Sequence, residues 1–356
     1  MGSAKSSSRL GAGEGLVEAV PGPPREDAHA EAAAGAPAAD SGQQRADALH
    51  SLLVAVPTLG KRPLLPLLER LVQEVRAVRR RGYVGAVVLL DNSSGLPPSL
   101  RAAAASLGVH YRHVTPRGFS QVRNAALDAA SQFDALVFID DDELPCPGWL
   151  EALVTSAESH HADVVVGPVL LMLPPSAPRW LAGGATLRPR RSQPDGPLRG
   201  SANSGNTLIR MSTVRRLGAR FHPALNTIGG EDTVFFGQLA QRGATLMWAG
   251  TAEAVETPDP ERLAVSYVVR RAYRAGRIMA VTDRMVKGET WSAAPRRVGR
   301  SCRGLLRLVL GGVCGRSSVC VLGLVDLSVA LGWFVTVAMP RGRRSVIDCR
   351  VWPSYA

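Results

Sequence analysis

The chain reads SLLVAVP from Ser51 to Pro57, a continuous apolar run of the kind found in buried parallel strands. An amphipathic helix follows, because leucines and valines recur at helical spacing until Gly82 ends the run. Three more apolar runs come next, with helical segments between them: GAVVLLD (85–91), VHYRHV (109–114) and ALVFID (135–140). This alternation predicts an α/β fold with a doubly wound, mostly parallel sheet and helices on both faces.

Polar residues stand at the carboxyl ends of three of these predicted strands, where sheets of this kind bind their ligands. They are Pro57–Thr58, Asp91–Asn92 and Asp140–Asp142. Because parallel strands end at the same edge of a sheet, we expect these residues to border one cleft.

The run FIDDDE (138–143) places three carboxylates directly after a buried strand. Such a cluster is costly unless a cation neutralises it. A divalent ion such as Mg²⁺ or Mn²⁺, held by one or two carboxylates and by phosphate oxygens, is the common solution. The alternative is an acidic turn that caps the helix opened by Pro147, but the strand-end position favours the metal.

Two further motifs carry candidate residues. GGEDTVFF (229–236) sets Glu231 and Asp232 in the first turn of a helix, where the helix dipole favours negative charge. Taken alone, an ordinary helix start explains it better than a catalytic role. PRGFSQVRNAAL (116–127) sets Arg123 and Asn124 early in another helix, where Arg123 either meets a phosphate or base or is solvated.

Composition narrows the class of protein. The 356 residues carry a net charge of +12 and five cysteines without a CxxC pair, which disfavours a disulfide framework or a zinc site and fits a reducing compartment. From Lys287 to Arg350 there are eleven basic and three acidic residues beside long apolar runs. Few aromatic residues lie between these basic residues. The excess of positive charge therefore favours an anionic membrane surface as partner and disfavours nucleic acid.

The chain divides into three segments by composition. Residues 1–48 are low in complexity, lack an apolar run typical of a signal peptide, and are expected to be disordered. Residues 49–285 hold the α/β domain, in which 174–202 form a long loop of the kind that covers or binds substrate. Residues 286–356 are expected to form a basic, apolar helical tail that associates with a membrane. Its apolar stretch 319–339 is interrupted only by Asp326.

That stretch leaves three alternatives for the tail. It could lie on the membrane surface, span the bilayer, or pack on the domain as core helices. Its many glycines and Asp326 disfavour a span, so surface association is expected.

In their order along the chain, VAVPT, VVLLDNSSG, RGFSQVRNAAL, FIDDDELPCPGWL, SGNTLIR and GGEDTVFF resemble the family 2 glycosyltransferases, which have the GT-A fold. The resemblance runs from about Leu53 to Met279. Within the family, GGEDTVFFGQLAQRG, ETPDPERL and RRAYRAGR look most like bacterial exopolysaccharide enzymes of the succinoglycan glucosyltransferase group.

The resemblance implies roles for the residues that bind the nucleotide sugar. Pro57 and Thr58 would border the nucleotide, and Asp91 would face the uracil or ribose. Arg123 and Asn124 would close the base and phosphate side.

The resemblance also implies a metal site and a catalytic pair. Asp140 and Asp142 would be the ends of a DxD motif, with Asp142 the direct metal ligand and Asp141 between them in the nucleotide-sugar site. Asp232 would be the general base and Glu231 its support. Asn206 would lie near the acceptor or the donor sugar. Many relatives carry a further histidine near the position of Glu256; this chain does not, which leaves a third protein ligand undefined.

These roles imply an inverting transferase that moves a hexose from a nucleotide diphosphate sugar, UDP-linked by resemblance, to a carbohydrate or lipid-linked acceptor. We expect it in the cytoplasm, at the inner face of the cell membrane. Two other functions remain open: a non-catalytic nucleotide-sugar-binding module, and a sugar nucleotidyltransferase, for which PTLGKRP (57–63) is a weak version of the usual glycine-rich basic loop.

Overall fold

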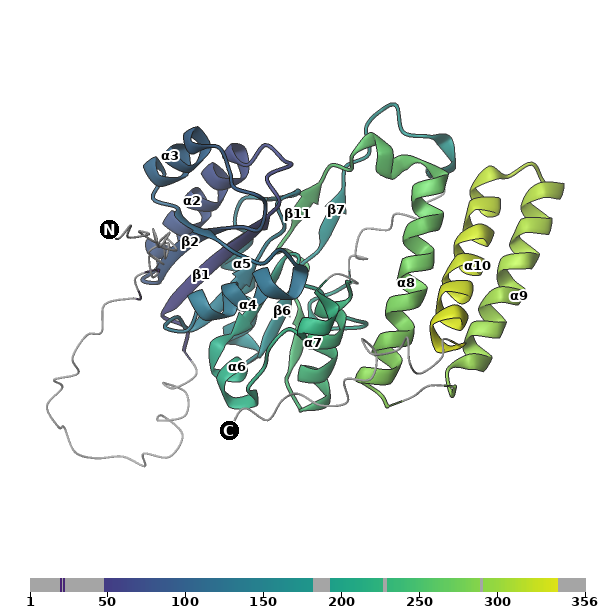
Figure 1. Cartoon of the computed structure of the whole chain (residues 1–356). Coiled ribbons are helices and arrows are strands. Elements are labelled where there is room, and N and C mark those ends of the chain that lie inside the picture. Colours follow the sequence, from purple (N-terminus) through teal and green to yellow (C-terminus); the bar gives the residue numbers. More distant parts are fainter. Residues whose placement is uncertain are drawn as a thin grey trace, which may run out of the picture.

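The computed structural model describes residues 20, 22, 48–181, 193–226, 229–288 and 291–338. Most of the predicted 1–48 segment, part of the predicted 174–202 loop and the end of the tail therefore lie outside the described residues. Strands and helices alternate through the first half of the domain (Figure 1): β1(Ser51–Thr58), α2(Leu65–Arg79), β2(Val84–Asp91), α3(Pro98–Ser106), β3(His110–His113), α4(Phe119–Ala129) and β4(Ala135–Phe138).

The eight strands of the main sheet lie in the order β3-β2-β1-β4-β9-β6-β10-β8. Strands β1 to β4 pair in parallel, as do β6 and β10. Strand β9 runs antiparallel between β4 and β6, and β8 runs antiparallel to β10. The remaining strands of this sheet are β6(Val164–Val166), β8(Gly196–Pro197), β9(Thr207–Arg210) and β10(Leu246–Trp248).

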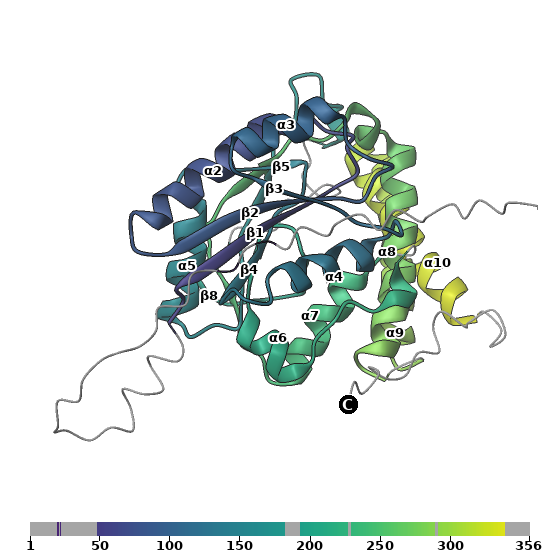
Figure 2. The ribbon, with the colours of Figure 1, turned by 60° about the vertical axis from the view of Figure 1, so that its left-hand side comes forward.

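Both faces of the sheet are buried under helices. Along β1, Leu52, Val54 and Val56 pack in the cluster that includes α2 and α3, while Leu53 and Ala55 pack on the other side with α4. Figure 2 shows these two helical layers, which are completed by α5(Trp149–Ser159) on the first face and by α6(Met211–Leu217) and α7(Glu231–Gln241) on the second. The predicted doubly wound, mostly parallel sheet with helices on both faces is confirmed.

The apolar run 163–172 forms two strands in different sheets. Strand β6 stays in the main sheet, and β7(Val169–Leu171) joins a small sheet with β5(Glu143–Pro145) and β11(Ala254–Glu256). The break falls at Pro168, which has no N–H to continue a ladder.

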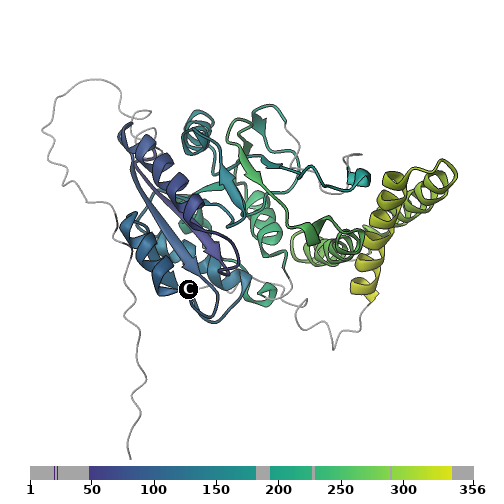
Figure 3. The same cartoon turned by 90° about the horizontal axis from the view of Figure 1, so that it is seen from above.

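Three long helices follow the sheets, and they stand beside the α/β domain in Figure 3. They are α8(Val265–Met285), α9(Ala294–Val313) and α10(Ser317–Ala338). Helix α10 packs between α8 and α9. At Gly276 of α8 a Cβ atom would overlap the carbonyl oxygen of Val329, so the glycine allows the two helices to approach closely. The short 3₁₀ segments are η1(Arg179–Leu181), η2(Pro223–Leu225) and η3(Pro260–Leu263).

Candidate active site

Two adjoining cavities lie beyond the carboxyl ends of β1 and β4. The first, here called the strand-end cavity, has a volume of about 690 Å³ and is bordered by Pro57, Thr58 and Asp140–Asp142. The second, the helix cavity, has a volume of about 830 Å³ and lies between α7 and α8. Phe119 and Arg123 line both cavities, so the two spaces meet at the start of α4.

The three aspartates of the strand-end cavity have different neighbours. Asp141 accepts a hydrogen bond of 2.6 Å from the hydroxyl of Thr58. Asp142 lies 3.0 Å from a guanidinium nitrogen of Arg262 and 3.6 Å from one of Arg62. The cation that neighbours Asp140 is Arg123, whose Nη2 lies 3.8 Å from the carboxylate.

Neighbouring carboxylates act on the pKa values of Asp140 and Asp141. Desolvation raises the pKa of Asp140 to about 6, with Arg123 opposing the rise and the Asp142 and Asp141 carboxylates adding to it. Burial likewise raises the pKa of Asp141, against the lowering effect of its hydrogen bond from Thr58. A divalent cation would relieve this repulsion.

The donor set fits such a cation. Among the described residues no group of three or more His, Cys, Asp or Glu side chains forms a ready-made metal cage. A divalent ion held by one or two carboxylates and completed by substrate phosphates requires no such cage. Asp140 and Asp142 can supply those carboxylates at the wall of the strand-end cavity.

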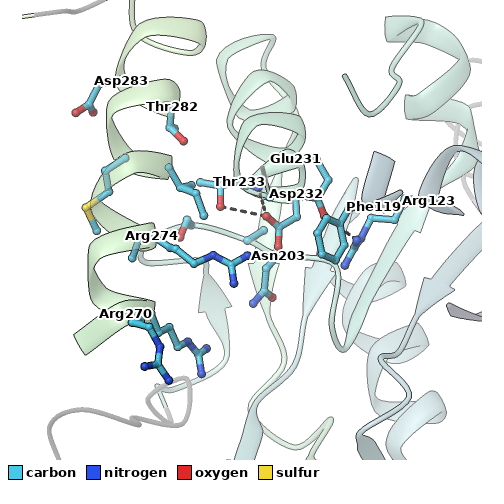
Figure 4. Close-up of a pocket in the computed structure, with 18 of the residues that line it drawn as sticks. Phe119, Arg123, Asn203, Glu231, Asp232, Thr233, Arg270, Arg274, Thr282 and Asp283 are labelled. Carbon is cyan, nitrogen blue, oxygen red and sulfur yellow. Dashed lines mark hydrogen bonds and ion pairs between the residues drawn. The ribbon is translucent and has the colours of Figure 1, made fainter. Parts of the chain in front are cut away.

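Arg123 connects the two acidic motifs. Its Nη1 lies 2.6 Å from Glu231, its Nε donates to the hydroxyl of Ser204 at 2.5 Å, and its other terminal nitrogen faces Asp140. The Arg123 and Glu231 side chains are only 11% and 4% exposed, so this ion pair is buried. Figure 4 shows Arg123 reaching from α4 to Glu231 at the start of α7.

Asp232 and Glu231 occupy different environments although they are neighbours in sequence. Gly230, with φ of 86°, caps α7 and turns the chain so that Asp232 faces the helix cavity while Glu231 is buried. Oδ1 of Asp232 accepts hydrogen bonds from the amide and hydroxyl of Thr233, at 2.6 and 3.3 Å. Its Oδ2 accepts none from the described residues, so Asp232 retains a carboxylate oxygen that can accept a proton.

The structure does not bring Asp91 to the strand-end cavity. Asp91 is fully buried, and its two oxygens accept hydrogen bonds from Ser93, from the amide of Leu96 and from the hydroxyl of Tyr111. Although burial alone would raise the pKa of Asp91, the bonds from Ser93 and Tyr111 lower it. Asp91 therefore fixes the loop after β2, and the next residue, Asn92, lines the cavity.

Asn124 and Asn206 are also used by the fold. Asn124 exchanges two hydrogen bonds of 2.9 Å with the backbone of Phe221. Asn206 has no exposed surface, and its amide bonds the carbonyls of Pro168 and Ala252 and the indole of Trp149. Neither asparagine lines the strand-end or the helix cavity, and their expected positions beside the nucleotide and the sugar stay predictions.

Several cavity residues were not singled out from the sequence. Arg262, in the run ETPDPERL, donates to both Asp142 and Glu256, at 3.0 and 2.9 Å. Arg270, Arg271 and Arg274 line the helix cavity from α8. The signals were present in the basic segment 260–279, but helical spacing alone does not show which face of a helix meets a cavity.

Residues 53–218 match the family described as Glycosyl transferase family 2. The chain is also 32% identical over 196 residues to the succinoglycan biosynthesis protein ExoM of Rhizobium meliloti (strain 1021), a match that covers 53% of this chain and 62% of ExoM. The chain thus spans less than two thirds of the length of this curated relative.

Two solved structures are similar at lower identity. S. aureus TarS 1–349 in complex with UDP-GlcNAc is 14% identical with a TM-score of 0.46, and the match covers 80% of this chain and 91% of TarS. GalNAc-T7 with UDP, GalNAc and Mn²⁺ is 16% identical with a TM-score of 0.47, and the match covers 66% of this chain and 50% of that one. The family match, over residues 53–218, covers less than half of this chain and includes β2 to β9 with Asp140–Asp142 of the strand-end cavity.

Proposed function

We propose that this protein is an inverting glycosyltransferase that moves a hexose from a nucleotide diphosphate sugar to a carbohydrate or lipid-linked acceptor. The match of residues 53–218 to glycosyl transferase family 2 and the similarity to a succinoglycan biosynthesis protein support a role in polysaccharide assembly. By the family resemblance we expect a UDP-linked sugar. The observation that carries the proposal is the position of two acidic motifs, one at each of two cavities that meet at Arg123.

The strand-end cavity is the proposed site of the nucleotide diphosphate. Asp140 and Asp142 would hold Mg²⁺ or Mn²⁺ there, and the ion would stabilise the negative charge of the departing diphosphate. Pro57 and Thr58 border the same space, and Asp141 is held by Thr58. Arg62 and Arg262, now paired with Asp142, supply further positive charge for the phosphates.

Asp232 is the proposed general base. Displacement with inversion requires a base that takes the proton of the acceptor hydroxyl on the face of the sugar opposite the leaving diphosphate. Asp232 faces the helix cavity with one carboxylate oxygen unengaged among the described residues. Glu231 is unsuited to this task because it is buried against Arg123, and its proposed role is to position that arginine.

Two isosteric substitutions test this assignment. Asp232→Asn keeps the shape of the side chain but removes proton acceptance, so we expect transfer to fall by about 10²–10⁴-fold. The affinity for UDP with Mn²⁺ should stay near that of the wild type, because the nucleotide site lies in the other cavity.

Glu231→Gln is the matched variant, with transfer and UDP binding measured in the same way. It should retain more transfer than Asp232→Asn. If Glu231→Gln is inactive and Asp232→Asn is normal, the base is Glu231. If both are normal, the pair is only a helix start and the mechanism is wrong.

The C-terminal helices are the proposed contact with the inner face of the cell membrane. Helix α10 is long and apolar enough to cross a bilayer by length and composition, and it is the one such helix among the described residues. However, α10 packs between α8 and α9, and its Asp326 is bonded to arginines of α9. These contacts favour surface association over a span.

The exposed face of α9 is the better candidate for contact with lipid. Six apolar residues recur along it at helical spacing, each at least half exposed: Val298, Leu305, Leu306, Val309, Leu310 and Val313. Burial of such a face in the headgroup region, aided by flanking arginines, is typical of interfacial helices.

Paired charge insertions test this contact. Leu306→Glu with Val309→Glu should abolish sedimentation with vesicles that contain phosphatidylglycerol. The control variant Leu65→Glu with Val84→Glu, at exposed positions of the α/β domain, should sediment with these vesicles as the wild type does. Equal sedimentation of all three proteins would contradict the proposal.

A further inference from the structure

The α8 wall of the helix cavity carries positive charge that the protein does not neutralise. Arg270 and Arg274 are one helical turn apart, both are exposed, and both line the cavity. Within the described part of the chain neither makes a hydrogen bond or an ion pair. Figure 4 shows the Arg274 side chain extending from α8 across the cavity toward Asn203 and Asp232.

The acidic residues of this cavity already have cationic partners, with one exception. Glu231 is paired with Arg123. Asp283 accepts from Arg297 at 3.0 Å and from Lys287 at 3.1 Å. Asp232 is the exception, and its charge alone does not balance the arginines of α8. A concave surface with surplus charge of one sign concentrates ligands of the opposite sign.

An unpaired polar atom lies beside these arginines. Oδ1 of Asn203 is buried and accepts no hydrogen bond within the described structure, although Asn203 lines the helix cavity. Buried amide oxygens in native proteins are normally paired, so this atom can accept a hydrogen bond from a ligand in the cavity. A sugar hydroxyl can supply the donor, and the same ligand could then present a second hydroxyl to Asp232.

We propose that the helix cavity binds a phosphate-bearing acceptor, with Arg270 and Arg274 holding the phosphate and Asn203 holding a hydroxyl. The guanidinium group binds phosphate through two parallel hydrogen bonds, which fixes orientation as well as position. This inference rests on the proposed function, since it names the class of acceptor that Asp232 would activate. The nucleotide diphosphate has a separate set of arginines, Arg62 and Arg262, in the strand-end cavity.

A binding experiment in saturating UDP isolates the helix cavity from the strand-end cavity. The probes are inorganic phosphate and farnesyl phosphate, titrated by calorimetry into the full chain. We expect the wild type to bind at least one probe. The double variant Arg270→Ala/Arg274→Ala should bind it at least about tenfold more weakly, because two charge-assisted contacts are lost.

The matched control is Arg80→Ala, which removes an exposed arginine at the end of α2, outside both cavities. It should bind phosphate and UDP as the wild type does. The double variant should also keep the wild-type affinity for UDP. Tighter binding of farnesyl phosphate than of inorganic phosphate would assign the phosphate to a lipid-linked acceptor, and equal binding would assign it to a phosphate without a lipid.

Two results would overturn the inference: no binding of either probe by the wild type, or equal binding by the wild type and the double variant. Neither readout requires turnover. A wild type that binds phosphate but transfers no sugar from any nucleotide sugar would refute the proposed function and leave the phosphate site standing. Normal transfer together with unaltered phosphate binding in the double variant would refute the phosphate site alone.

Discussion

Asp140 and Asp326 both lie beside arginines, but their surroundings differ: the Asp140 side chain is 39% exposed at the cavity wall and the Asp326 side chain is 4% exposed. Asp326 in α10 accepts hydrogen bonds from Arg300, Arg303 and Arg307, at distances from 2.6 to 3.2 Å. Burial alone would raise the pKa of Asp326, but the bonds from these arginines lower it. At Asp140, burial and neighbouring carboxylates raise the pKa to about 6 against a single distant arginine.

The difference separates an aspartate that stabilises the fold from one that the fold leaves uncompensated. Three arginines around Asp326 join α9 to α10, so the ion pairs hold the tail together. The carboxylates near Asp140 repel one another, which costs stability unless a ligand supplies positive charge. Such an uncompensated group in a cavity is typical of a functional site, and the predictions below compare the two aspartates.

The largest expected effect concerns the metal. Asp142→Ala should lower Mn²⁺-stimulated transfer at least about 100-fold, because stabilisation of the leaving diphosphate by a cation contributes several kcal/mol. The free energy of unfolding should change little. Steady-state kinetics with and without chelator measures the first quantity and urea titration the second.

Glu69→Ala is the control for that experiment, since Glu69 is an exposed acid on α2. It should leave both quantities unchanged. Full transfer by Asp142→Ala in the presence of chelator would refute the metal site. A loss of stability without a loss of metal response would instead make Asp142 a structural ion pair like Asp326.

Asp326→Asn should lower the free energy of unfolding by about 2 kcal/mol or more, because three arginines lose a charged acceptor that is 4% exposed. Transfer per folded molecule should be unchanged. Urea titration monitored by tryptophan fluorescence is suitable, since Trp333 lies buried on the same helix. An unchanged unfolding midpoint would contradict the structural role.

Asp140→Asn is the counterpart of that variant. It removes one of several mutually repelling carboxylates, so the free energy of unfolding should stay equal or rise by up to about 1 kcal/mol. Differential scanning calorimetry without metal provides the measurement. A loss of stability as large as that of Asp326→Asn would remove the contrast between the two sites.

The smallest effect is a dependence on pH. Because the folded-state pKa of Asp326 is lowered, its stabilisation is complete above the unfolded pKa of about 3.9. It is lost as the pH falls through the lower folded value. The stabilities of the wild type and Asp326→Asn should therefore differ by a constant amount from pH 5 to 7 and converge below about pH 4. A constant difference down to pH 3 would contradict the assignment.

The order of strands and helices could be predicted from the sequence because both faces of the sheet are buried. Apolar runs such as Ser51–Thr58 then differ clearly from amphipathic helices such as Leu65–Arg79. The antiparallel direction of β9 could not be predicted, because the sequence TLIR reads equally well in either direction. The packing of α10 on α8, and of α9 on α10, could not be predicted either. It depends on close helix contacts at glycines such as Gly276.

The site could be predicted where a residue type has few structural uses at its position. Clustered carboxylates at Asp140–Asp142 are costly after a buried strand, so the sequence marks them as candidates, and they border the strand-end cavity. Glu231 and Asp232 were singled out only through the family resemblance, and they border the helix cavity. The backbone bonds of Asn124 and Asn206 could not be predicted, because an amide can bond the backbone as readily as a ligand. The roles within the site stay predictions.

The central claim is that this chain transfers a sugar with inversion and releases a nucleoside diphosphate. The most direct test incubates the purified full chain with α-linked UDP-hexoses, Mn²⁺ and an acceptor mixture, and follows the anomeric protons and the phosphorus signals by NMR. We expect UDP and a β-linked glycoside to form in equal amounts. Formation of UTP and hexose 1-phosphate when inorganic diphosphate is added to the UDP-hexose would indicate a nucleotidyltransferase. An α-linked product would exclude direct displacement, so either result would contradict the account.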